Sequence, residues 1–423
     1  MAVQRAVSRT RRAAARFGTR RRGPDGRRFG RAGLVGIAAL LLAAGTGLGA
    51  GPAAAGPIYP APDPDAFYAA PADVARFNLG DVMRSRQVPA PSYPGATAWQ
   101  LLFRSTDSQG GPIGAVTTVL VPPGGGANRP VVSYQPFVNA LGLRCAPSHA
   151  LFDGGLREGP VLNLLLGRGW AVAVPDHLGP NSAYGAARLG GRITLDGLRA
   201  VQRFAPAGLG GSPMGLAGYS GGGMATGFAA ALAPDYAPEL PLVGVAEGGV
   251  PMNIGKLALD LGMQPNPLFG LGFAAAMGLE REYPGQLPME AILKPAGADM
   301  RNRIANGCTD EIIAAGANRS LPDVFSGPLD TADPETVRIL HENSLEIFPG
   351  VPRIPTYVWH GTNDAVSPQL VREVVGRYCG SGARVQLDML PGTDHGTAIP
   401  EGSARAFDFL ADRFAGVPAP ANC

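Results

Sequence analysis

The sequence predicts a mostly parallel α/β sheet flanked by helices, with a long helical insertion before the last two strands. Near the start of the sheet, two apolar runs separated by a polar turn at 108–111 are typical of an antiparallel pair, and later apolar runs alternate with helical patterns. This order is typical of a parallel sheet with an antiparallel beginning. The expected strands are 100–105, 114–121, 130–134, 170–174, 213–217, 242–246, 356–359 and 385–390. The expected helices are 161–166, 194–204, 223–232, 370–378 and 403–414.

A G-x-S-x-G motif at 218–222 lies between an expected strand and an expected helix. At a strand-to-helix turn this motif is the nucleophile elbow of α/β-hydrolases, which lifts the Ser220 hydroxyl above the sheet edge. The Gly221 N–H would then lie at a helix N-terminus, where the helix dipole favours a developing oxyanion. Because the chain contains 61 glycines, the motif alone is weak, and its context carries the prediction.

The segment 248–355 separates two expected strands and lacks their pattern. Roughly a hundred residues are too many for a loop, and the segment contains apolar helical pieces. We interpret it as a cap or lid over the active site, with a second helical layer of no role in access as the alternative. The expected organisation is a signal peptide at 1–55, a Pro-rich arm at 56–95, a core in two parts at 96–247 and 356–423, and the cap at 248–355.

A serine nucleophile needs a base, and the base needs an orienting acid. In α/β-hydrolases the acid follows the serine in the chain, and the histidine base follows the acid. Three histidines follow Ser220. His395 lies in a Gly-flanked loop between the last strand and the last helix and is the expected base. His341 falls in the insertion. His360 directly follows a strand and is interpreted as a structural turn histidine.

Asp364 is the expected acid, because it lies in the loop just beyond the penultimate strand. Asp394 is the rival, but neighbours in an extended loop point apart, so it is poorly placed to hold His395. Asp388 lies inside a strand. The second oxyanion donor is expected from the loop after the third strand, 135–140, which contains Asn139 and no H-G-G-G motif.

The N-terminal region has the features of a secretory signal. The first 31 residues contain 11 Arg and one acidic residue, and an apolar stretch at 34–48 precedes an A-A-A site at 53–55. We expect export and cleavage, leaving no membrane span. A twin-arginine signal at 27–29 and a retained anchor are less favoured alternatives. Removing residues 1–55 changes the net charge from +3 to about −7, which argues against a nucleic-acid partner.

Four cysteines remain in the expected mature chain. An even number in a secreted protein predicts two disulfides, and three pairings are open. The sequence has no C-x-x-C or Cys/His cluster, and it predicts neither a metal nor a cofactor. The cysteines are Cys145, Cys308, Cys379 and Cys423.

An ordered set of short motifs resembles the secretory lipase family, known from fungal and actinobacterial secreted triacylglycerol lipases. The matching segments are G-D-V-M-R-S-R at 80–86, S-Y-Q at 133–135, C-A-P-S at 145–148, P-D-H-L-G-P at 175–180, G-Y-S-G-G at 218–222, W-H-G-T-N-D at 359–364 and G-T-D-H at 392–395. The resemblance implies an α/β-hydrolase fold with a helical cap and a triad of Ser220, Asp364 and His395, with Gly221 as an oxyanion donor.

The resemblance also implies the pairing Cys145–Cys308 and Cys379–Cys423. The family usually carries Asp at the position of Asn139; a backbone N–H donor survives this change, whereas a contribution from a protonated carboxyl does not. Asp176 and His177 are interpreted as structural polar residues near the site.

The leading interpretation is a secreted serine ester hydrolase acting on lipids, specifically a triacylglycerol lipase. The expected partner is a lipid ester, and transient binding to a lipid interface is left open. The alternatives are a carboxylesterase on shorter or wall-derived lipid esters, an acyltransferase that uses the same acyl-enzyme, and a noncatalytic binding protein that has kept the fold.

Overall fold

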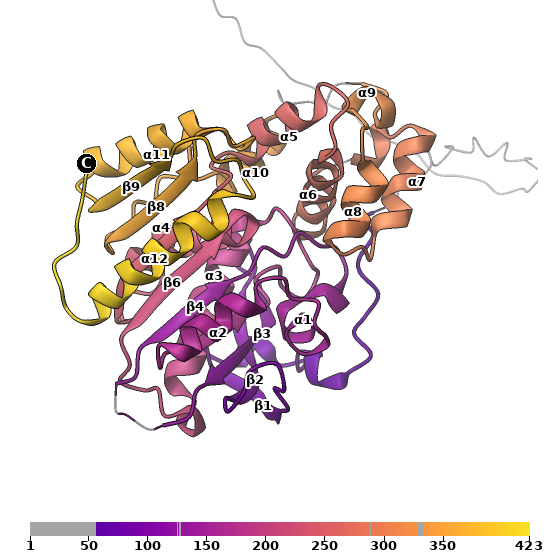
Figure 1. Cartoon of the computed structure of the whole chain (residues 1–423). Helices are drawn as coiled ribbons and strands as arrows, with labels where there is room; N and C mark the ends of the chain where they lie inside the picture. Colours follow the sequence, from indigo (N-terminus) through magenta and orange to yellow (C-terminus); the bar gives the residue numbers. More distant parts are fainter. Residues whose placement is uncertain (1–55, 125, 127, 288, 328–332) are drawn as a thin grey trace, which may run out of the picture. The chain divides into compact units, whose positions relative to one another are not determined.

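The computed structural model describes residues 56–124, 126, 128–287, 289–327 and 333–423. Within them a nine-stranded sheet has the order β1-β2-β3-β5-β4-β6-β7-β8-β9 (Figure 1). The pairs β1–β2, β2–β3 and β3–β5 are antiparallel and the remaining pairs are parallel. This is the predicted fold class. The strands are β1 Val82–Val88, β2 Thr97–Thr106, β3 Pro112–Val121, β4 Val131–Gln135, β5 Ala171–Pro175, β6 Met214–Tyr219, β7 Leu242–Gly248, β8 Thr356–Gly361 and β9 Val385–Leu390.

Helices cover both faces of the sheet (Figure 1). Along β6, Met214 and Leu216 join one hydrophobic cluster, while Ala217 and Tyr219 join the other, as the two-residue period of a strand buried on both faces requires. The first face carries α3 Ala187–Arg203, α4 Ser220–Tyr236 and α11 Pro368–Gly380. The second carries α1 Pro147–Asp153, α2 Gly159–Gly167 and α12 Ala398–Phe414.

The segment between β7 and β8 is helical, as predicted, and much of it has its own hydrophobic core. Side chains of α6 to α9 form a separate cluster, and Leu141 is the buried residue that joins it from outside the segment. By contrast, Ile339 of α10 packs into the cluster on the sheet. The helices are α5 Ile254–Gly262, α6 Phe269–Glu282, α7 Pro295–Ile304, α8 Thr309–Gly316, α9 Leu321–Val324 and α10 Pro334–Glu342. None of the helices in the described ranges is long and apolar enough to cross a membrane.

Two disulfides connect distant parts of the chain, with the pairing that the resemblance implies. Cys145–Cys308 joins residues 163 apart and ties the segment before α1 to the start of α8. Cys379–Cys423 joins residues 44 apart and fixes the C-terminus to α11.

The C-terminal tail lies along the outer edge of β9. Asn422 N donates to Val385 O at 3.1 Å, and the Asn422 amide group exchanges two hydrogen bonds of 2.8 Å with the backbone of Leu387. Arg384 also donates to Ala419 O at 2.7 Å. The last residues thus satisfy backbone groups that an edge strand would otherwise present to solvent.

The structure differs from the sequence expectation at two early elements. The predicted arm at 56–95 contains an edge strand, β1, whose sequence V-M-R-S-R-Q-V lacks a clear apolar alternation. Helix α3 begins at Ala187, earlier than expected, and continues through Gly190 and Gly191. A Cβ at Gly191 would lie 2.8 Å from the backbone of Phe228, so glycine here permits close packing of α3 on α4.

Candidate active site

The G-x-S-x-G motif forms a tight strand-to-helix turn. Ser220 is the first residue of α4, directly after β6, and its φ of 54° lies in the left-handed region that costs a non-glycine residue free energy. A Cβ at Gly222 would lie 1.9 Å from Gln135 O, and one at Gly218 would lie 2.7 Å from Gly222 O. Both outer positions of the motif therefore exclude a side chain, because backbone occupies the space.

Ser220, His395 and Asp364 form a continuous hydrogen-bonded chain. Ser220 Oγ lies 2.8 Å from His395 Nε2, and His395 Nδ1 lies 2.9 and 2.8 Å from the two carboxyl oxygens of Asp364. A carboxylate only accepts hydrogen bonds, so Nδ1 carries the ring hydrogen and Nε2 is left to accept from the serine hydroxyl. The three residues follow the C-terminal ends of β6, β9 and β8, which meet at one edge of the sheet.

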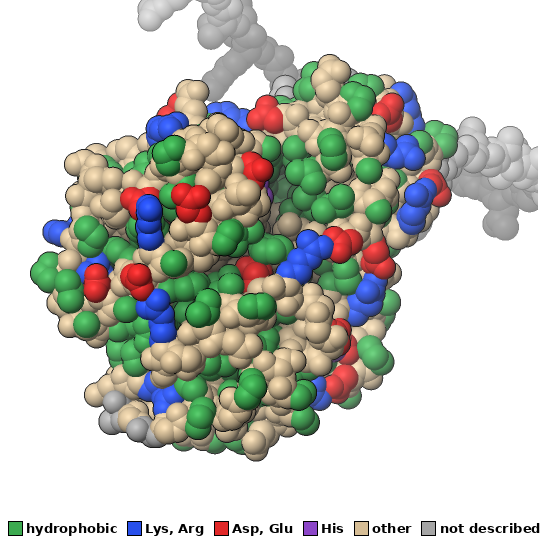
Figure 2. Space-filling view, viewed as in Figure 1, with side chains coloured by type: hydrophobic (Ala, Val, Ile, Leu, Met, Phe, Trp, Pro, Cys, Tyr) green, Lys and Arg blue, Asp and Glu red, His purple; other side chains and the backbone are tan. Residues whose placement is uncertain are grey.

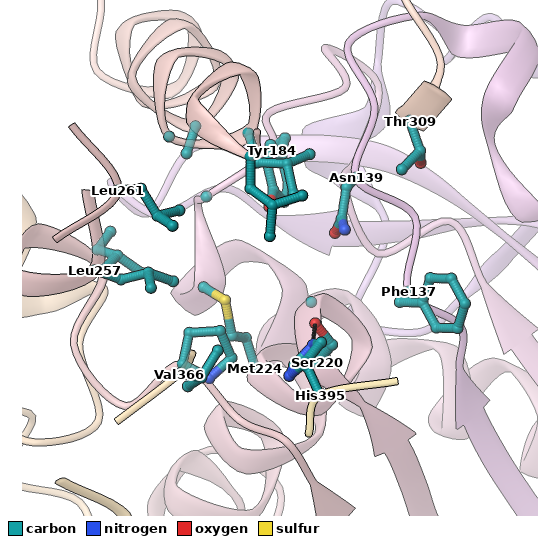
Figure 3. Close-up of a pocket in the computed structure, with 18 of the residues that line it drawn as sticks. Phe137, Asn139, Tyr184, Ser220, Met224, Leu257, Leu261, Thr309, Val366 and His395 are labelled. Carbon is teal, nitrogen blue, oxygen red and sulfur yellow. Dashed lines mark hydrogen bonds between the residues drawn. The ribbon is translucent and has the colours of Figure 1, made fainter. Parts of the chain in front are cut away.

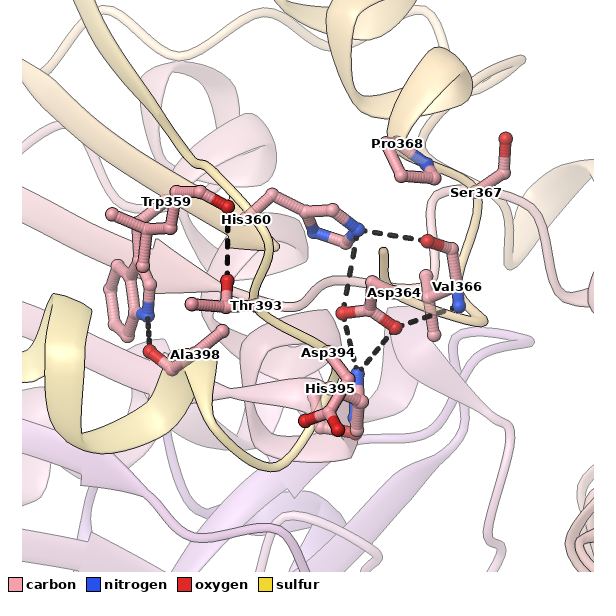
Figure 4. Close-up of polar contacts among 12 residues, drawn as sticks. Trp359, His360, Asp364, Val366, Ser367, Pro368, Thr393, Asp394, His395 and Ala398 are labelled. Atoms are coloured by element: carbon pink, nitrogen blue, oxygen red, sulfur yellow. Dashed lines mark hydrogen bonds and ion pairs between the residues drawn. The ribbon is translucent and has the colours of Figure 1, made fainter. Parts of the chain in front are cut away.

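The Asp364 side chain is fully buried between two histidines (Figure 4). One carboxyl oxygen accepts from Val366 N at 2.8 Å, and His360 Nε2 lies 3.5 Å from the other. His360 Nε2 donates to Val366 O at 2.8 Å, which fits the interpretation of a turn histidine. Burial lowers the pKa of His360, so this ring is neutral next to Asp364. The sequence did not indicate this closeness.

The backbone at His395 is held from two sides. The Tyr219 hydroxyl donates to His395 O at 2.6 Å. The Asp394 carboxylate accepts from the N–H groups of Gly396 and Thr397 at 3.0 and 2.8 Å, and these bonds lower the pKa of Asp394. Asp394 therefore caps the turn into α12 and does not hold the His395 ring. Tyr219 was missed because the middle positions of the motif carry no signal.

The other two sequence candidates lie elsewhere. Asp388 on β9 accepts from the Tyr357 hydroxyl at 2.8 Å and pairs with Arg405 at 3.3 Å. His341 is exposed on α10. Neither residue belongs to the hydrogen-bonded chain from Ser220.

The loop 136–142 after β4 passes beside the start of α4. A Cβ at Gly221 would lie 2.4 Å from Asn139 Oδ1, so the Asn139 side chain reaches the turn that carries Ser220. Asn139 is buried, and its Oδ1 has no hydrogen-bond partner among the described residues. Gly221 lies in the first turn of α4, where N–H groups lack partners within the helix. Both expected oxyanion residues therefore lie beside Ser220.

A buried glutamate holds the start of this loop. Glu158 accepts from Phe137 N and from the Tyr134 hydroxyl, both at 2.8 Å. Burial raises the Glu158 pKa to about 8. This role of Glu158 was not predictable from sequence, because its partner in the loop is a backbone N–H.

Asp176 and His177 are both buried, in agreement with their structural interpretation. Asp176 accepts from Ser148 N at 2.8 Å and from Ser148 Oγ at 2.6 Å, and burial raises its pKa to about 6. Burial lowers the pKa of His177 to about 4, which keeps the ring neutral.

Ser220 and His395 open into a cavity of about 240 Å³ between the sheet and the helices of the segment 248–355 (Figure 3). In Figure 2 hydrophobic side chains gather around the recess between these two parts. Helices α5 and α6 and the turn between them contribute mostly aliphatic side chains, among them Ile254, Leu257, Leu261, Leu268, Leu271 and Ala275. The other end of the cavity is more polar, with Asn139 and Arg157 from the core and Thr309 from α8 beside Phe137. No group of three or more His, Cys, Asp or Glu in the described ranges is arranged to hold a metal ion.

Comparisons with known proteins show which family this chain resembles. A family model described as secretory lipase matches residues 158–422. A lipase A of Arthroderma benhamiae is 33% identical over 398 residues, covering 87% of this chain and 82% of its own length. A probable inactive lipase of Mycobacterium tuberculosis is 32% identical over 387 residues, covering 86% of this chain and 84% of its own length.

The fold likewise matches a solved structure. The structure of Candida antarctica lipase A in its closed state has a TM-score of 0.79 and 27% identity, covering 85% of this chain and 90% of that one. The family model, the relatives and the solved structure each match a lipase over more than half of this chain. The chain belongs to the secretory lipase family.

Proposed function

We propose that this chain is a serine ester hydrolase that cleaves carboxylic esters of lipids, with triacylglycerols as the specific substrate. The observation that carries the proposal is the hydrogen-bonded chain from Ser220 through His395 to Asp364 at an apolar cavity. The base lies 2.8 Å from the nucleophile and 2.8–2.9 Å from the orienting acid, which is the geometry that acyl transfer needs.

In the proposed reaction, Ser220 Oγ attacks the ester carbonyl while His395 Nε2 takes the hydroxyl proton. His395 then gives that proton to the departing alcohol oxygen, leaving an acyl group on Ser220. Water attacks the acyl-enzyme and loses a proton to His395, which then returns that proton to Ser220 Oγ as the bond to the acyl group breaks and the fatty acid leaves. Asp364 fixes the ring and stabilises the imidazolium without becoming protonated.

The backbone N–H groups of Gly221 and Asn139 are the proposed oxyanion donors. Such preorganised donors are worth about 10²–10³ in kcat each, because they act where charge develops. Asn139 carries an amide where the family usually has a carboxyl, and the backbone N–H does not depend on the side chain, so we assign the donor role to the backbone.

The distribution of side chains in the cavity supports a lipid ester. Aliphatic side chains of the cap suit an acyl chain, and the more polar end with Arg157 and Thr309 suits the alcohol part. Leu259, Met263 and Leu268 are exposed on α5 and the turn that follows it, and Leu268 also lines the cavity. We infer that 248–355 acts as a cap whose exposed corner contacts the lipid surface.

The decisive experiment uses residues 56–423 on p-nitrophenyl esters of graded acyl length and on a triacylglycerol emulsion, beside Ser220→Ala. A serine-reactive phosphonate followed by mass spectrometry locates the nucleophile. Hydrolysis that is lost in the variant, with the adduct on Ser220, is the expected result. A preference for short soluble esters without activity on the emulsion would replace the lipase by a carboxylesterase, and product partition toward added alcohol would indicate an acyltransferase.

Inactive, unlabelled protein with both disulfides formed would favour the noncatalytic reading, and the relative described as probably inactive makes this outcome worth testing. Export is part of the proposal. The Arg-rich, apolar N-terminal pattern and the two disulfides support secretion after removal of residues 1–55. Residues 1–55 lie outside the described part of the chain.

A further inference from the structure

Arg281, near the end of cap helix α6, is a buried cation surrounded by backbone carbonyls. Its side chain is among the largest fully buried ones, and the residue is 2% exposed. All three guanidinium nitrogens donate to carbonyl oxygens, and no carboxylate among the described residues pairs with it. The acceptors are Ile58 O at 2.7 Å, Leu141 O at 2.8 Å, Asn181 O at 3.0 Å, Ser182 O at 3.1 Å and Ala305 O at 2.7 Å.

Burying this charge carries a large desolvation penalty, which a residue that only filled space would not need. Burial lowers the Arg281 pKa to about 10, yet the group remains charged at neutral pH. An unpaired buried charge persists only where hydrogen bonds compensate it, and an aliphatic side chain would pack more cheaply. The neighbouring Glu280 pairs with Arg301 at 2.9 Å instead. The guanidinium therefore serves to hold the five carbonyls in place.

One of these carbonyls belongs to the loop that carries Asn139. Leu141 O accepts from Arg281, and Leu141 N donates to Gly307 O at 2.9 Å. The Leu141 side chain is buried in the hydrophobic cluster of helices α6 to α9. At the other end of the loop, Glu158 accepts from Phe137 N. The loop is thus fixed at both ends, and Asn139 lies between the two anchors.

Two further carbonyls belong to a second loop beside the cavity. Ser182 has a φ of 45°, a conformation that persists only when neighbours hold it, and Arg281 binds its carbonyl. The Ser182 hydroxyl donates to Ala140 O at 3.1 Å, so this loop braces the residue next to Asn139. Tyr184, two residues later, lines the cavity (Figure 3). A Cβ at Gly278 would lie 2.0 Å from Tyr184 O, so α6 rests directly on this loop.

We propose that Arg281 is a positioning residue for the oxyanion loop, acting through Leu141 and Ser182 on the Asn139 N–H. The proposal rests on the serine-hydrolase function above. It assigns the end of α6 a part in the site itself, beyond covering the substrate. A misplacement of about 1 Å at an oxyanion donor costs up to about 10²-fold in rate, because the donor must meet the oxyanion of the transition state.

The test compares Arg281→Lys and Arg281→Met with Arg301→Met in residues 56–423. Arg301 is similarly buried in the cap and binds Glu280, Glu290 and Gly56 O, and within the described ranges it makes no hydrogen bond to either loop. On a short soluble p-nitrophenyl ester, Arg281→Met is expected to lower kcat by about tenfold or more with KM within about twofold, and Arg281→Lys by less. Arg301→Met is expected to lose thermal stability while keeping kcat.

A kcat unchanged in folded Arg281→Met, or lowered equally in Arg301→Met, would overturn the proposal. If the Arg281 variants do not fold, Ser182→Ala decides, because it removes one hydroxyl and leaves no large cavity. A kcat for Ser182→Ala within error of the parent overturns the proposal, and a fall of about threefold or more at constant KM supports it. Activity retained by Ser220→Ala would instead show that the proposed function itself is wrong.

Discussion

Glu247 on β7 makes the stability of this fold depend on pH. The residue is 1% exposed, and its Oε2 has no hydrogen-bond partner among the described residues. A Cβ at Gly227 of α4 would lie 2.6 Å from this oxygen, so the carboxyl group presses against the helix that carries Ser220. Burial raises the Glu247 pKa from 4.5 to about 8, and we expect the change Glu247→Gln to remove this titration.

The sign follows from the raised pKa. Below about pH 4.5 the carboxyl is protonated in both states and adds no pH dependence. Between about pH 4.5 and pH 8 the unfolded chain releases the proton while the folded chain keeps it, so stability falls as the pH rises. At 1.36 kcal/mol per pKa unit, this residue removes about 3 kcal/mol of unfolding free energy between about pH 5.5 and pH 8.

The assay is urea unfolding of the parent and Glu247→Gln at these two pH values. The parent is expected to lose about 3 kcal/mol more than the variant. Glu401→Gln is the control, because it makes the same change at an exposed glutamate on α12. Other buried carboxyls titrate in both proteins, so only the difference between the losses of the parent and of Glu247→Gln reports on Glu247. Equal losses in parent and Glu247→Gln would refute the reasoning.

Two further predictions concern the turn at Ser220 and the docking of the cap. Gly222→Ala should abolish ester hydrolysis and lower the melting temperature, because the added Cβ would lie 1.9 Å from Gln135 O. The control is Gly376→Ala in α11, where the added Cβ meets open space and should stabilise the fold by about 0.5–1 kcal/mol. An active, stable Gly222→Ala enzyme would contradict the geometry. Replacing Cys145 and Cys308 together by Ser should lower the unfolding free energy by up to about 5 kcal/mol, since the bond closes 163 residues. It should also lower kcat, measured on a short ester. Loss of the tail disulfide should cost about 4 kcal/mol for its 44 residues and spare kcat; equal kcat losses would argue against a specific role of the first bond.

The sequence predicted those parts of the site that obey local rules. Ser220, Asp364 and His395 each follow an apolar strand, and the residue types restrict the chemistry, so strand order and motif spacing suffice to bring them together. The helical segment after β7 was predicted for a similar reason, because its length exceeds any loop.

The residues that hold the site were not predicted, because they bind backbone atoms. Glu158 accepts from a backbone N–H, Tyr219 donates to a backbone carbonyl, and Arg281 donates to five carbonyls. Backbone partners have no residue type, and therefore leave no pattern in a sequence. Arg281 and Arg301 look alike in the chain, and only the fold distinguishes them.

The start of α3 was predicted too late in the chain, for a different reason. Glycine usually weakens a helix, so the pair Gly190 and Gly191 obscured its first turns. In the structure a Cβ at Gly191 would lie 2.8 Å from the Phe228 backbone in α4, and one at Gly190 would lie 3.0 Å from the Ala225 side chain. At these two positions the packing of α3 against α4 outweighs the low helix propensity of glycine.

The tail along β9 has a consequence for behaviour at high concentration. An open sheet invites other chains to extend it by strand addition, and such growth can continue into aggregates. Here the last residues already occupy the β9 edge, and Cys379–Cys423 prevents them from leaving. The disulfide thus protects the β9 edge from self-association, in addition to crosslinking the tail to α11. Loss of Cys379–Cys423 alone would release this cover without disturbing Ser220, so solubility at high concentration should fall while kcat is retained.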